Sequence, residues 1–221
     1  MKSKVLIVDD HPIFTMGMAE LLNQEDDFIV CAVAEDVASA RKALKEYTPD
    51  LGIIDITLAG DNGLDLVKEI AASKRVMPTL VLSMHNEQVW AERAIRAGAK
   101  GYIMKGEASD NVIFALRNIL AGNIHVSGSI MARLLDKFQM KPDAPGAATI
   151  DLLTDRELEV FRLIGSGLST REIADRLKLG IKTIGTYRDR IKQKLLLKSG
   201  AELTRRAVLW TEREDCGSVK P

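Results

Sequence analysis

Hydrophobic and polar residues follow two different rhythms in residues 1–121. Short continuous apolar runs, each of the length of a buried strand, recur at Val5–Val8, Phe28–Ala34, Leu51–Ile54, Leu80–Leu82 and Gly101–Met104. Apolar residues at spacings of three and four, the rhythm of an amphipathic helix, occur at Met16–Leu22, Ala38–Leu44, Leu64–Ala72, Val89–Ala97 and Val112–Leu120. Strands that alternate with helices predict an α/β fold with a doubly wound, five-stranded parallel sheet covered on both faces.

The pattern changes after residue 121. Residues 122–150 are rich in glycine and proline, and they include a stretch typical of a flexible linker (Lys141–Ala148) and one short amphipathic stretch (Ile130–Phe138). Residues 151–211 have helical periodicity and no strand signal, which predicts a small all-α domain of four helices. The polar residues 212–221 are expected to form a disordered tail. The chain thus divides into an α/β domain, a linker with a short helix, a helical domain and a tail.

The composition is that of a globular protein, with 46% hydrophobic and 28% charged residues among 221. No apolar run approaches the ~18 residues of a membrane span. The apolar stretch Val5–Val8 is too short for the core of a signal peptide. We therefore expect a cytoplasmic protein without a membrane partner. Cys31 and Cys216 lie far apart and predict neither a disulfide framework nor a metal site.

Polar residues follow the predicted strands where they end. Asp9 and Asp10 follow the first strand, Asp55 the third, Ser83 the fourth and Lys105 the fifth. In a parallel α/β sheet these carboxyl ends line one crevice, where ligands bind. Three carboxylates in one crevice repel each other unless a cation lies among them, and oxygen ligands beside a phosphate favour Mg²⁺. With a lysine and a hydroxyl nearby, the set predicts a site for a phosphoryl group attached to a carboxylate.

Simpler explanations exist for parts of this pattern. Acidic residues are common in surface loops, so Asp9 and Asp10 alone carry little weight, whereas agreement at five strand ends carries much more. The chain has no GxGxxG turn and no GxxxxGK[ST] loop, which disfavours a dinucleotide or P-loop site. It shows no nucleophile–base pair for an external substrate. We therefore expect a phosphoacceptor with at most Mg²⁺-dependent self-phosphorylation and autodephosphorylation, and not an enzyme.

Four segments resemble the receiver domain of bacterial two-component response regulators, namely Val5–His11, Ile53–Asp55, Val81–Ser83 and Gly101–Lys105. The resemblance covers about residues 1–121 and implies a flavodoxin-like sheet and a sensor histidine kinase that donates a phosphoryl group to Asp55. It also implies that Asp10, Asp55 and the backbone carbonyl of Thr57 ligate Mg²⁺, with Asp9 acting largely through water.

The same resemblance implies a switch. Ser83 and Lys105 would sense the phosphoryl group, and Tyr102 would turn inward when Ser83 moves. An ordinary half-buried strand tyrosine is the alternative for Tyr102. The chain departs from the family at Ala59, where proline is usual, and a looser loop is expected there.

The predicted third helix of the second domain, about Ile181–Leu196, has two distinct faces. One face is an apolar stripe, made of Ile184, Tyr187, Ile191 and Leu195. The opposite and flanking positions are polar and mostly basic, and the candidate DNA contacts there are Lys182, Thr183, Thr186, Arg188, Asp189, Arg190 and Lys192. A short scaffold helix, a tight turn and a basic helix describe a helix-turn-helix whose outer face enters the major groove. A small solvated helical bundle is the simpler alternative.

Local segments of this domain resemble the LuxR-type helix-turn-helix, namely Leu153–Glu157, Gly167–Ala174, Lys182–Ile184 and Arg190–Leu195. Two capping boxes, Thr154 with Glu157 and Ser169 with Glu172, mark the starts of the first two helices. Both domains together resemble the NarL/FixJ-type response regulators. Gly180, Gly185 and Asp189 depart from the family, so its base contacts are not carried over at 185 and 189.

The combined resemblance implies a transcription factor controlled by phosphorylation. Its partners would be a sensor histidine kinase, double-stranded promoter DNA and a second copy of the chain, with RNA polymerase as a further candidate. Leu203, Ala207 and Trp210 of the fourth helix are candidates for a dimer surface, and core packing explains them equally well. The alternative functions are a receiver-controlled protein-interaction module and a DNA binder that acts independently of phosphorylation.

The formal net charge of zero does not argue against nucleic acid as a partner. Residues 1–123 hold 13 Lys and Arg against 18 Asp and Glu, whereas residues 151–211 hold 13 against 8. The net charge is zero because an acidic first domain offsets a basic second domain. This is the distribution expected for a metal-dependent receiver and a DNA-binding module.

Overall fold

The structure, a computed structural model, describes residues 1–58, 60–73, 75–84, 86–139 and 150–216. The chain separates into two compact units, residues 1–140 and 141–221, and each is described by itself. Ala59 and the expected linker stretch Lys141–Ala148 lie outside the described residues. The expected domain boundaries at residues 121 and 151 stay predictions.

The first unit contains one five-stranded sheet, as the apolar runs predicted. Its strands are β1 (Ser3–Val8), β2 (Phe28–Ala34), β3 (Leu51–Asp55), β4 (Thr79–Ser83) and β5 (Gly101–Met104). They lie in the order β2-β1-β3-β4-β5, and every pair is parallel. The strand order reverses direction at β1, so the connection that leaves β1 and the one that leaves β3 run to opposite sides. This leaves a crevice at the carboxyl ends of the two strands.

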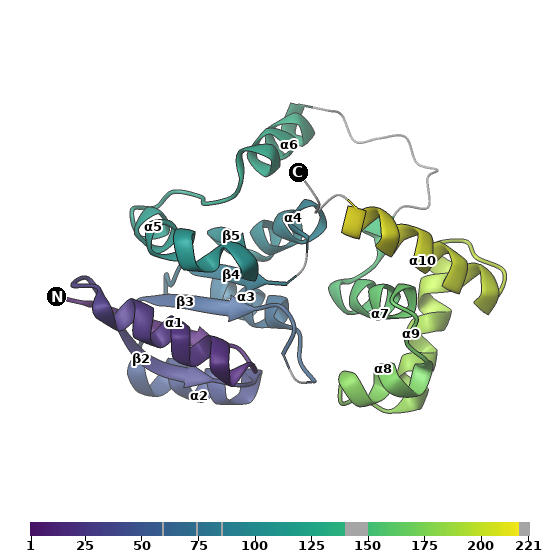
Figure 1. The fold of residues 1–221 in the computed structure, drawn as a ribbon, viewed down its shortest axis with the longest axis horizontal. Coiled ribbons are helices and arrows are strands. Elements are labelled where there is room, and N and C mark those ends of the chain that lie inside the picture. Colours follow the sequence, from purple (N-terminus) through teal and green to yellow (C-terminus); the bar gives the residue numbers. More distant parts are fainter. Residues whose placement is uncertain (59, 74, 85, 140–149, 217–221) are drawn as a thin grey trace. The chain divides into compact units, whose positions relative to one another are not determined.

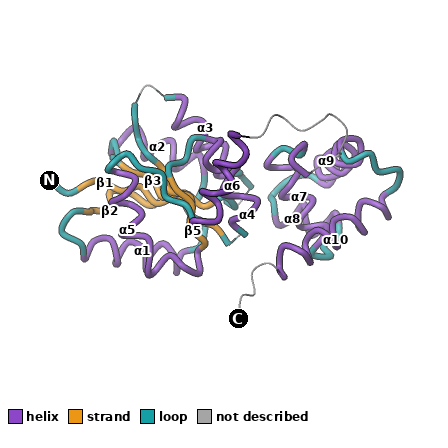
Figure 2. The backbone as a smooth tube through the Cα atoms, turned by 90° about the horizontal axis from the view of Figure 1, so that it is seen from above, coloured by secondary structure: helices purple, strands orange, loops and turns teal. Residues whose placement is uncertain are grey.

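Helices cover both faces of this sheet, which confirms the doubly wound prediction (Figures 1 and 2). They are α1 (Pro12–Gln24), α2 (Val37–Tyr47), α3 (Gly63–Ala72), α4 (Glu87–Ala97) and α5 (Ala108–Leu120). Helices α1 and α5 lie on one face and α2 and α3 on the other (Figure 2). Alternate strand residues such as Ile7, Ile53 and Leu82 pack with Leu22 of α1 and Leu116 of α5. Because the intervening residues are also covered, the strands read as continuous apolar runs.

Gly63 places the first residue of α3 directly against the end of β3. A Cβ at this position would lie 1.8 Å from the backbone carbonyl oxygen of Asp55. The Gly63 N–H donates to the carbonyl of Ile56 at 2.7 Å, which closes the intervening loop. Asn62 caps α3 by accepting a hydrogen bond from the Leu64 N–H. Only glycine allows this close approach, which holds the loop after Asp55 beside the crevice.

Part of the expected linker is attached to the first unit. The backbone of His125 pairs with Gly101 of β5, and helix α6 (Gly128–Gln139) packs on α4. Helix α6 matches the short amphipathic stretch expected over Ile130–Phe138. The helix packs on α4, and Ile130 of its apolar stripe is only 2% exposed. Sequence periodicity alone could not identify that surface.

The second unit is all α, as predicted. Its helices are α7 (Asp155–Gly165), α8 (Thr170–Arg176), α9 (Ile181–Lys194) and α10 (Gly200–Cys216). A short 3-10 turn at Ile150–Leu152 precedes α7, and another occurs in the first unit at Lys105–Glu107. Both predicted capping boxes are present at the starts of α7 and α8. The expected tail requires correction at residues 212–216, which belong to α10, whereas residues 217–221 lie outside the described residues. The polar composition of residues 212–216 gave no sign of a helix, because the buried residues of α10, Leu203 and Ala207, lie earlier in the chain.

No helix among the described residues combines the length and the apolar character needed to span a membrane.

Candidate functional site

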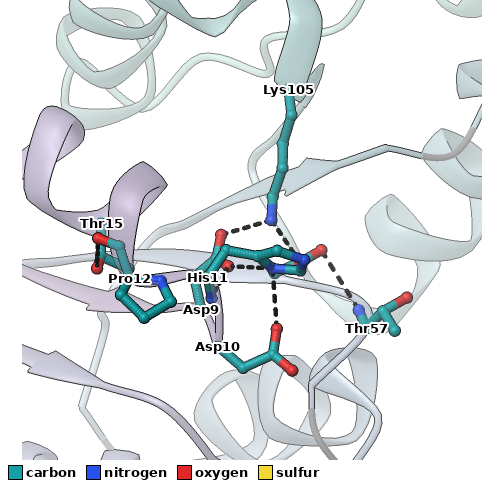
Figure 3. Close-up of polar contacts among 8 residues, drawn as sticks. Asp9, Asp10, His11, Pro12, Thr15, Thr57 and Lys105 are labelled. Atoms are coloured by element: carbon teal, nitrogen blue, oxygen red, sulfur yellow. Dashed lines mark hydrogen bonds and ion pairs between the residues drawn. The ribbon is translucent and has the colours of Figure 1, made fainter. Parts of the chain in front are cut away.

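The crevice at the ends of β1 and β3 holds a buried lysine between two buried carboxylates (Figure 3). The Lys105 Nζ lies 2.6 Å from Asp9 Oδ2 and 2.6 Å from Asp55 Oδ2. The three side chains are 5%, 2% and 3% exposed. Lys105 also lies over the ring of Phe14, with Nζ 4.7 Å from the ring centroid. The ammonium thus neutralises charge that burial would otherwise make costly.

Asp10 and His11 complete the mouth of the crevice (Figure 3). The Nδ1 atom of His11 lies 3.0 Å from Asp9 Oδ1 and 2.9 Å from Asp10 Oδ1. The candidate ligand atoms of Asp9, Asp10, His11 and Asp55 all lie within 4.8 Å of one another. This cluster of carboxylates has the donor chemistry of a site for a divalent metal ion. His11 was not among the predicted site residues, although its position directly after Asp10 is the signal that points to it.

Burial dominates the electrostatics of Asp55. It raises the pKa of this carboxyl from 3.8 to about 6, and the nearby charge of Asp9 acts in the same direction. The Lys105 ammonium and the backbone N–H of Thr57, which donates to Asp55 Oδ1 at 3.3 Å, oppose the rise. Asp55 is therefore largely ionised at neutral pH but poorly solvated, which favours its use as a nucleophile.

The two predicted switch residues lie on the adjoining strands. Asp55 pairs in register with Leu82 of β4, so Ser83, which is fully buried, lies one residue beyond it at the same edge of the sheet. Tyr102 lies on β5 with its side chain 2% exposed. Its burial is greater than that of the half-buried tyrosine considered as the alternative. The sensing and switching roles of both residues stay predictions.

Helix α9 has the two faces that its sequence predicted. In the predicted apolar stripe Ile184, Ile191 and Leu195 are buried and Tyr187 is half-buried. The candidate DNA contacts are exposed or half-buried, namely Lys182, Thr183, Thr186, Arg188, Asp189, Arg190 and Lys192. One pairing was missed: Asp189 Oδ1 lies 2.9 Å from Lys192 Nζ. Oppositely charged residues three positions apart on a helix commonly pair, so the sequence could have predicted this contact. The acid on the outer face is thus partly neutralised by its neighbour.

The candidate dimer surface on α10 requires correction for two of its three residues. Leu203 and Ala207 are completely buried, because α10 packs with this face on α7. The core-packing explanation therefore holds for both. Trp210 is half-buried, and its ring lies 5.5 Å from that of Phe161 of α7. Its role in dimerisation stays a prediction.

The fold and both sites can now be compared with known proteins. Residues 5–117 match the family described as the response regulator receiver domain, and residues 151–207 match the bacterial regulatory proteins of the luxR family. This chain joins a parallel sheet that has an acidic crevice to a helical domain of the luxR type. That combination defines a two-component response regulator. The chain belongs to this family, with a LuxR-type DNA-binding domain; the family comprises regulators and not catalytic enzymes.

Individual relatives match along most of the chain. The oxygen regulatory protein NreC of Staphylococcus aureus is 32% identical over 209 residues, which cover 93% of this chain and 96% of NreC. A structure of RcsB from Salmonella enterica serovar Typhimurium, bound to promoter rprA in the presence of the phosphomimetic BeF3-, is 25% identical with a TM-score of 0.60, covering 93% of this chain and 98% of RcsB. A structure of two RcsB dimers bound to two parallel DNAs is 27% identical, with a TM-score of 0.57 and coverage of 96% and 99%.

Proposed function

We propose that this protein accepts a phosphoryl group on Asp55 from a sensor histidine kinase and, in that state, binds promoter DNA through α9. The observation that carries the proposal is the position of Asp55, a buried carboxylate with a raised pKa beside the Lys105 ammonium. The acidic first unit and the basic second unit, joined in one chain, support the pairing of the two activities. Because the proposed DNA partner lies in the bacterial cytoplasm, we propose that the protein acts there.

In the transfer step, an oxygen of the Asp55 carboxylate attacks the phosphorus of the kinase phosphohistidine. The new P–O bond forms as the P–N bond breaks, and the imidazole nitrogen leaves with the electron pair. Lys105, already 2.6 Å from Asp55, is placed to exchange its contact with the carboxylate for one with a phosphoryl oxygen.

The acidic cluster is also the proposed site of Mg²⁺. Asp10, Asp55 and the backbone carbonyl of Thr57 would hold the ion, with Asp9 acting largely through water. The fit rests on oxygen donors within 4.8 Å of one another in a crevice that carries excess negative charge. The imidazole of His11 is a weaker donor for Mg²⁺ and would instead orient Asp9 and Asp10, which it contacts. When bound, the ion supplies charge neutralisation for the incoming phosphoryl oxygens.

In the second unit, the exposed face of α9 is the proposed DNA surface. The exposed Thr183 and Thr186 would contact bases, while Lys182, Arg188, Arg190 and Lys192 would contact phosphates. The RcsB structures support DNA binding, because that relative is described on promoter DNA and as dimers on DNA. We propose a homodimer in the phosphorylated or DNA-bound state, with RNA polymerase as a further partner.

The decisive experiment compares DNA binding in three states of Asp55. High-affinity duplexes would be selected from a random library with the phosphorylated protein. Affinity would then be measured for the unmodified protein, the phosphorylated protein and Asp55→Asn. We expect phosphorylation to tighten binding by about ten-fold, equivalent to ~1.4 kcal/mol, and Asp55→Asn not to respond.

Asp26→Asn, an exposed aspartate of the first unit, is the matched control and should respond like the unmodified sequence. Equal affinity in all states would contradict phosphorylation control and favour a DNA binder that acts independently of it. Absence of the steep salt dependence of phosphate contacts would contradict DNA binding itself and favour a protein-interaction module.

A further inference from the structure

The segment that leaves α5, residues 123–133, contacts β5, which carries Tyr102, and the first turn of α4, which follows Ser83 in the chain; we call this segment the connector. At its start, the His125 N–H donates to the Lys100 carbonyl at 2.8 Å, and the His125 carbonyl accepts from the Tyr102 N–H at 2.9 Å. These bonds form a parallel bridge at the edge of β5, the last strand of the sheet. The backbone of Tyr102 is therefore tied directly to the connector.

The edge of β5 is shaped to receive this segment. A Cβ at Gly101 would lie 3.0 Å from the His125 carbonyl oxygen and 3.3 Å from its Cβ, so a side chain there would crowd the connector. On its other side, the His125 ring packs edge-on against Phe114 of α5, with centroids 5.8 Å apart. Burial lowers the pKa of His125, in keeping with a neutral ring in this packing.

The far end of the connector is attached to the first turn of α4. Glu87 Oε1 accepts hydrogen bonds from the hydroxyls of Ser127 at 2.9 Å and Ser129 at 3.2 Å. Arg133 donates to the backbone carbonyl of Gln88 at 2.7 Å. These bonds join the start of α6 to the start of α4, and Glu87 is the centre of the attachment.

The attachment also holds α6 together. The Ser127 hydroxyl that donates to Glu87 accepts from the Ile130 N–H at 3.3 Å, so one group caps α6 and fastens it to α4. Ile130 is 2% exposed and anchors the same turn. Only residues 84–86 separate Ser83, the last residue of β4, from Glu87, the first of α4.

From these contacts we infer that the connector responds to phosphorylation of the site through two attachments, one to Tyr102 on β5 and one to Glu87 on α4. The inference rests on the proposed function. When Ser83 is drawn toward a phosphoryl group, the first turn of α4 shifts relative to β5. The connector cannot follow both elements, so its serine–glutamate bonds break while the bonds to β5 persist. Release of α6 from α4 then frees the chain that leads to the helical unit.

Hydrogen exchange of the full-length protein, with and without beryllofluoride and Mg²⁺, tests this inference. Peptides covering 127–133 should exchange at least about three-fold faster with beryllofluoride, whereas the amides of Tyr102 and His125 should change little. Glu87→Ala should accelerate exchange over 127–133 without beryllofluoride and leave little further increase when it is added. Ser129→Ala, which leaves α4 intact, should give a smaller change in the same direction. Glu20→Ala, which removes an exposed glutamate of α1 that accepts a hydrogen bond from its neighbour Gln24, is the control.

The outcomes separate the inference from the function on which it rests. If peptides around Asp55 become protected by beryllofluoride but exchange over 127–133 does not change, the connector does not read the site and only this inference is overturned. If Glu87→Ala exchanges like Glu20→Ala over 127–133, the serine–glutamate attachment is likewise overturned. If no protection appears around Asp55, both the inference and the proposed acceptor role are overturned.

Discussion

The Lys105 ammonium and the Asp55 carboxylate form a buried ion pair across the sheet, with Nζ and Oδ2 2.6 Å apart although the two residues are 50 positions apart in the sequence. The same ammonium contacts Asp9 at the same distance. One cation therefore holds two carboxylates from different strands at the mouth of the crevice. This arrangement makes the site sensitive to the loss of either charge.

Replacement of Lys105 by Met should lower the free energy of unfolding by about 3 kcal/mol at pH 7 without divalent metal, because it leaves two buried carboxylates without their cation. Mg²⁺ should restore part of the loss by supplying positive charge at the same crevice. Urea unfolding with and without Mg²⁺ measures both effects. Lys42→Met, at an exposed position of α2, is the control. Equal stability of the two variants would show that the ion pair contributes no net stability.

Asp55 should make stability depend on pH between about 6 and 3.8, its folded pKa and its ordinary value. Because the folded pKa is the higher one, the folded state takes up a proton first as the pH falls through this range. The contribution of Asp55 to stability therefore rises on acidification and is least favourable above pH 6. Asp55→Asn should thus raise the free energy of unfolding at pH 7 by at most about 3 kcal/mol without metal.

The advantage of Asp55→Asn should shrink as the pH approaches 4, and urea unfolding at several pH values will follow it. Asp26→Asn should show no comparable pH-dependent gain. A constant difference between Asp55→Asn and the unmodified protein across this range would contradict the raised pKa.

Leu196 has a left-handed backbone, with φ of 56°, and its side chain is 77% exposed. This conformation costs an L-residue about 1 kcal/mol, which its exposed side chain does not recover by packing. Leu196→Gly should therefore raise the free energy of unfolding by about 0.5–1 kcal/mol in thermal unfolding of the full chain. Leu196→Ala keeps the Cβ and should give no such gain. If the alanine variant is as stable as the glycine variant, backbone strain is not the cause.

Asp189 lies on the outer face of α9 and pairs with Lys192. Asp189→Asn removes a charge that repels DNA phosphates and frees the lysine for them. Affinity for a random-sequence duplex should rise about three-fold or more, with a salt dependence steeper by about one counterion. Fluorescence anisotropy at several salt concentrations measures both quantities. Asp151→Asn, an exposed site outside α9, should leave both unchanged. Weaker non-specific binding by Asp189→Asn would show that the carboxylate helps to position α9.

Much of the fold follows from local patterns. The strand runs are continuous because both faces of the sheet are covered, and the capping boxes at Thr154 and Ser169 mark helix starts through contacts within four residues. The outer face of α9 could also be predicted, because an angular pattern is a property of one helix. The carboxyl ends of the strands predicted that Asp9, Asp55 and Lys105 meet, since parallel topology brings such ends to one edge.

Other features needed the folded chain, because periodicity shows that a helix has an apolar face but not what covers it. Leu203 and Ala207 fitted a dimer surface and a core equally well, and only packing on α7 decided for the core. In the same way, only packing on α4 showed that α6 is fastened to the first unit. The contacts of His11 with Asp9 and Asp10 depend on the turn after β1 and not on residue type.

The sequence by itself determined the two kinds of domain, the parallel sheet, the acidic crevice and the basic face of α9, because these depend on residue types at regular spacings. The tertiary structure decided which side chains contact one another. It placed one lysine between two carboxylates, and it joined the connector to both Tyr102 and Glu87. These contacts link residues far apart in the chain, and their geometry exists only once the helices have packed on the sheet.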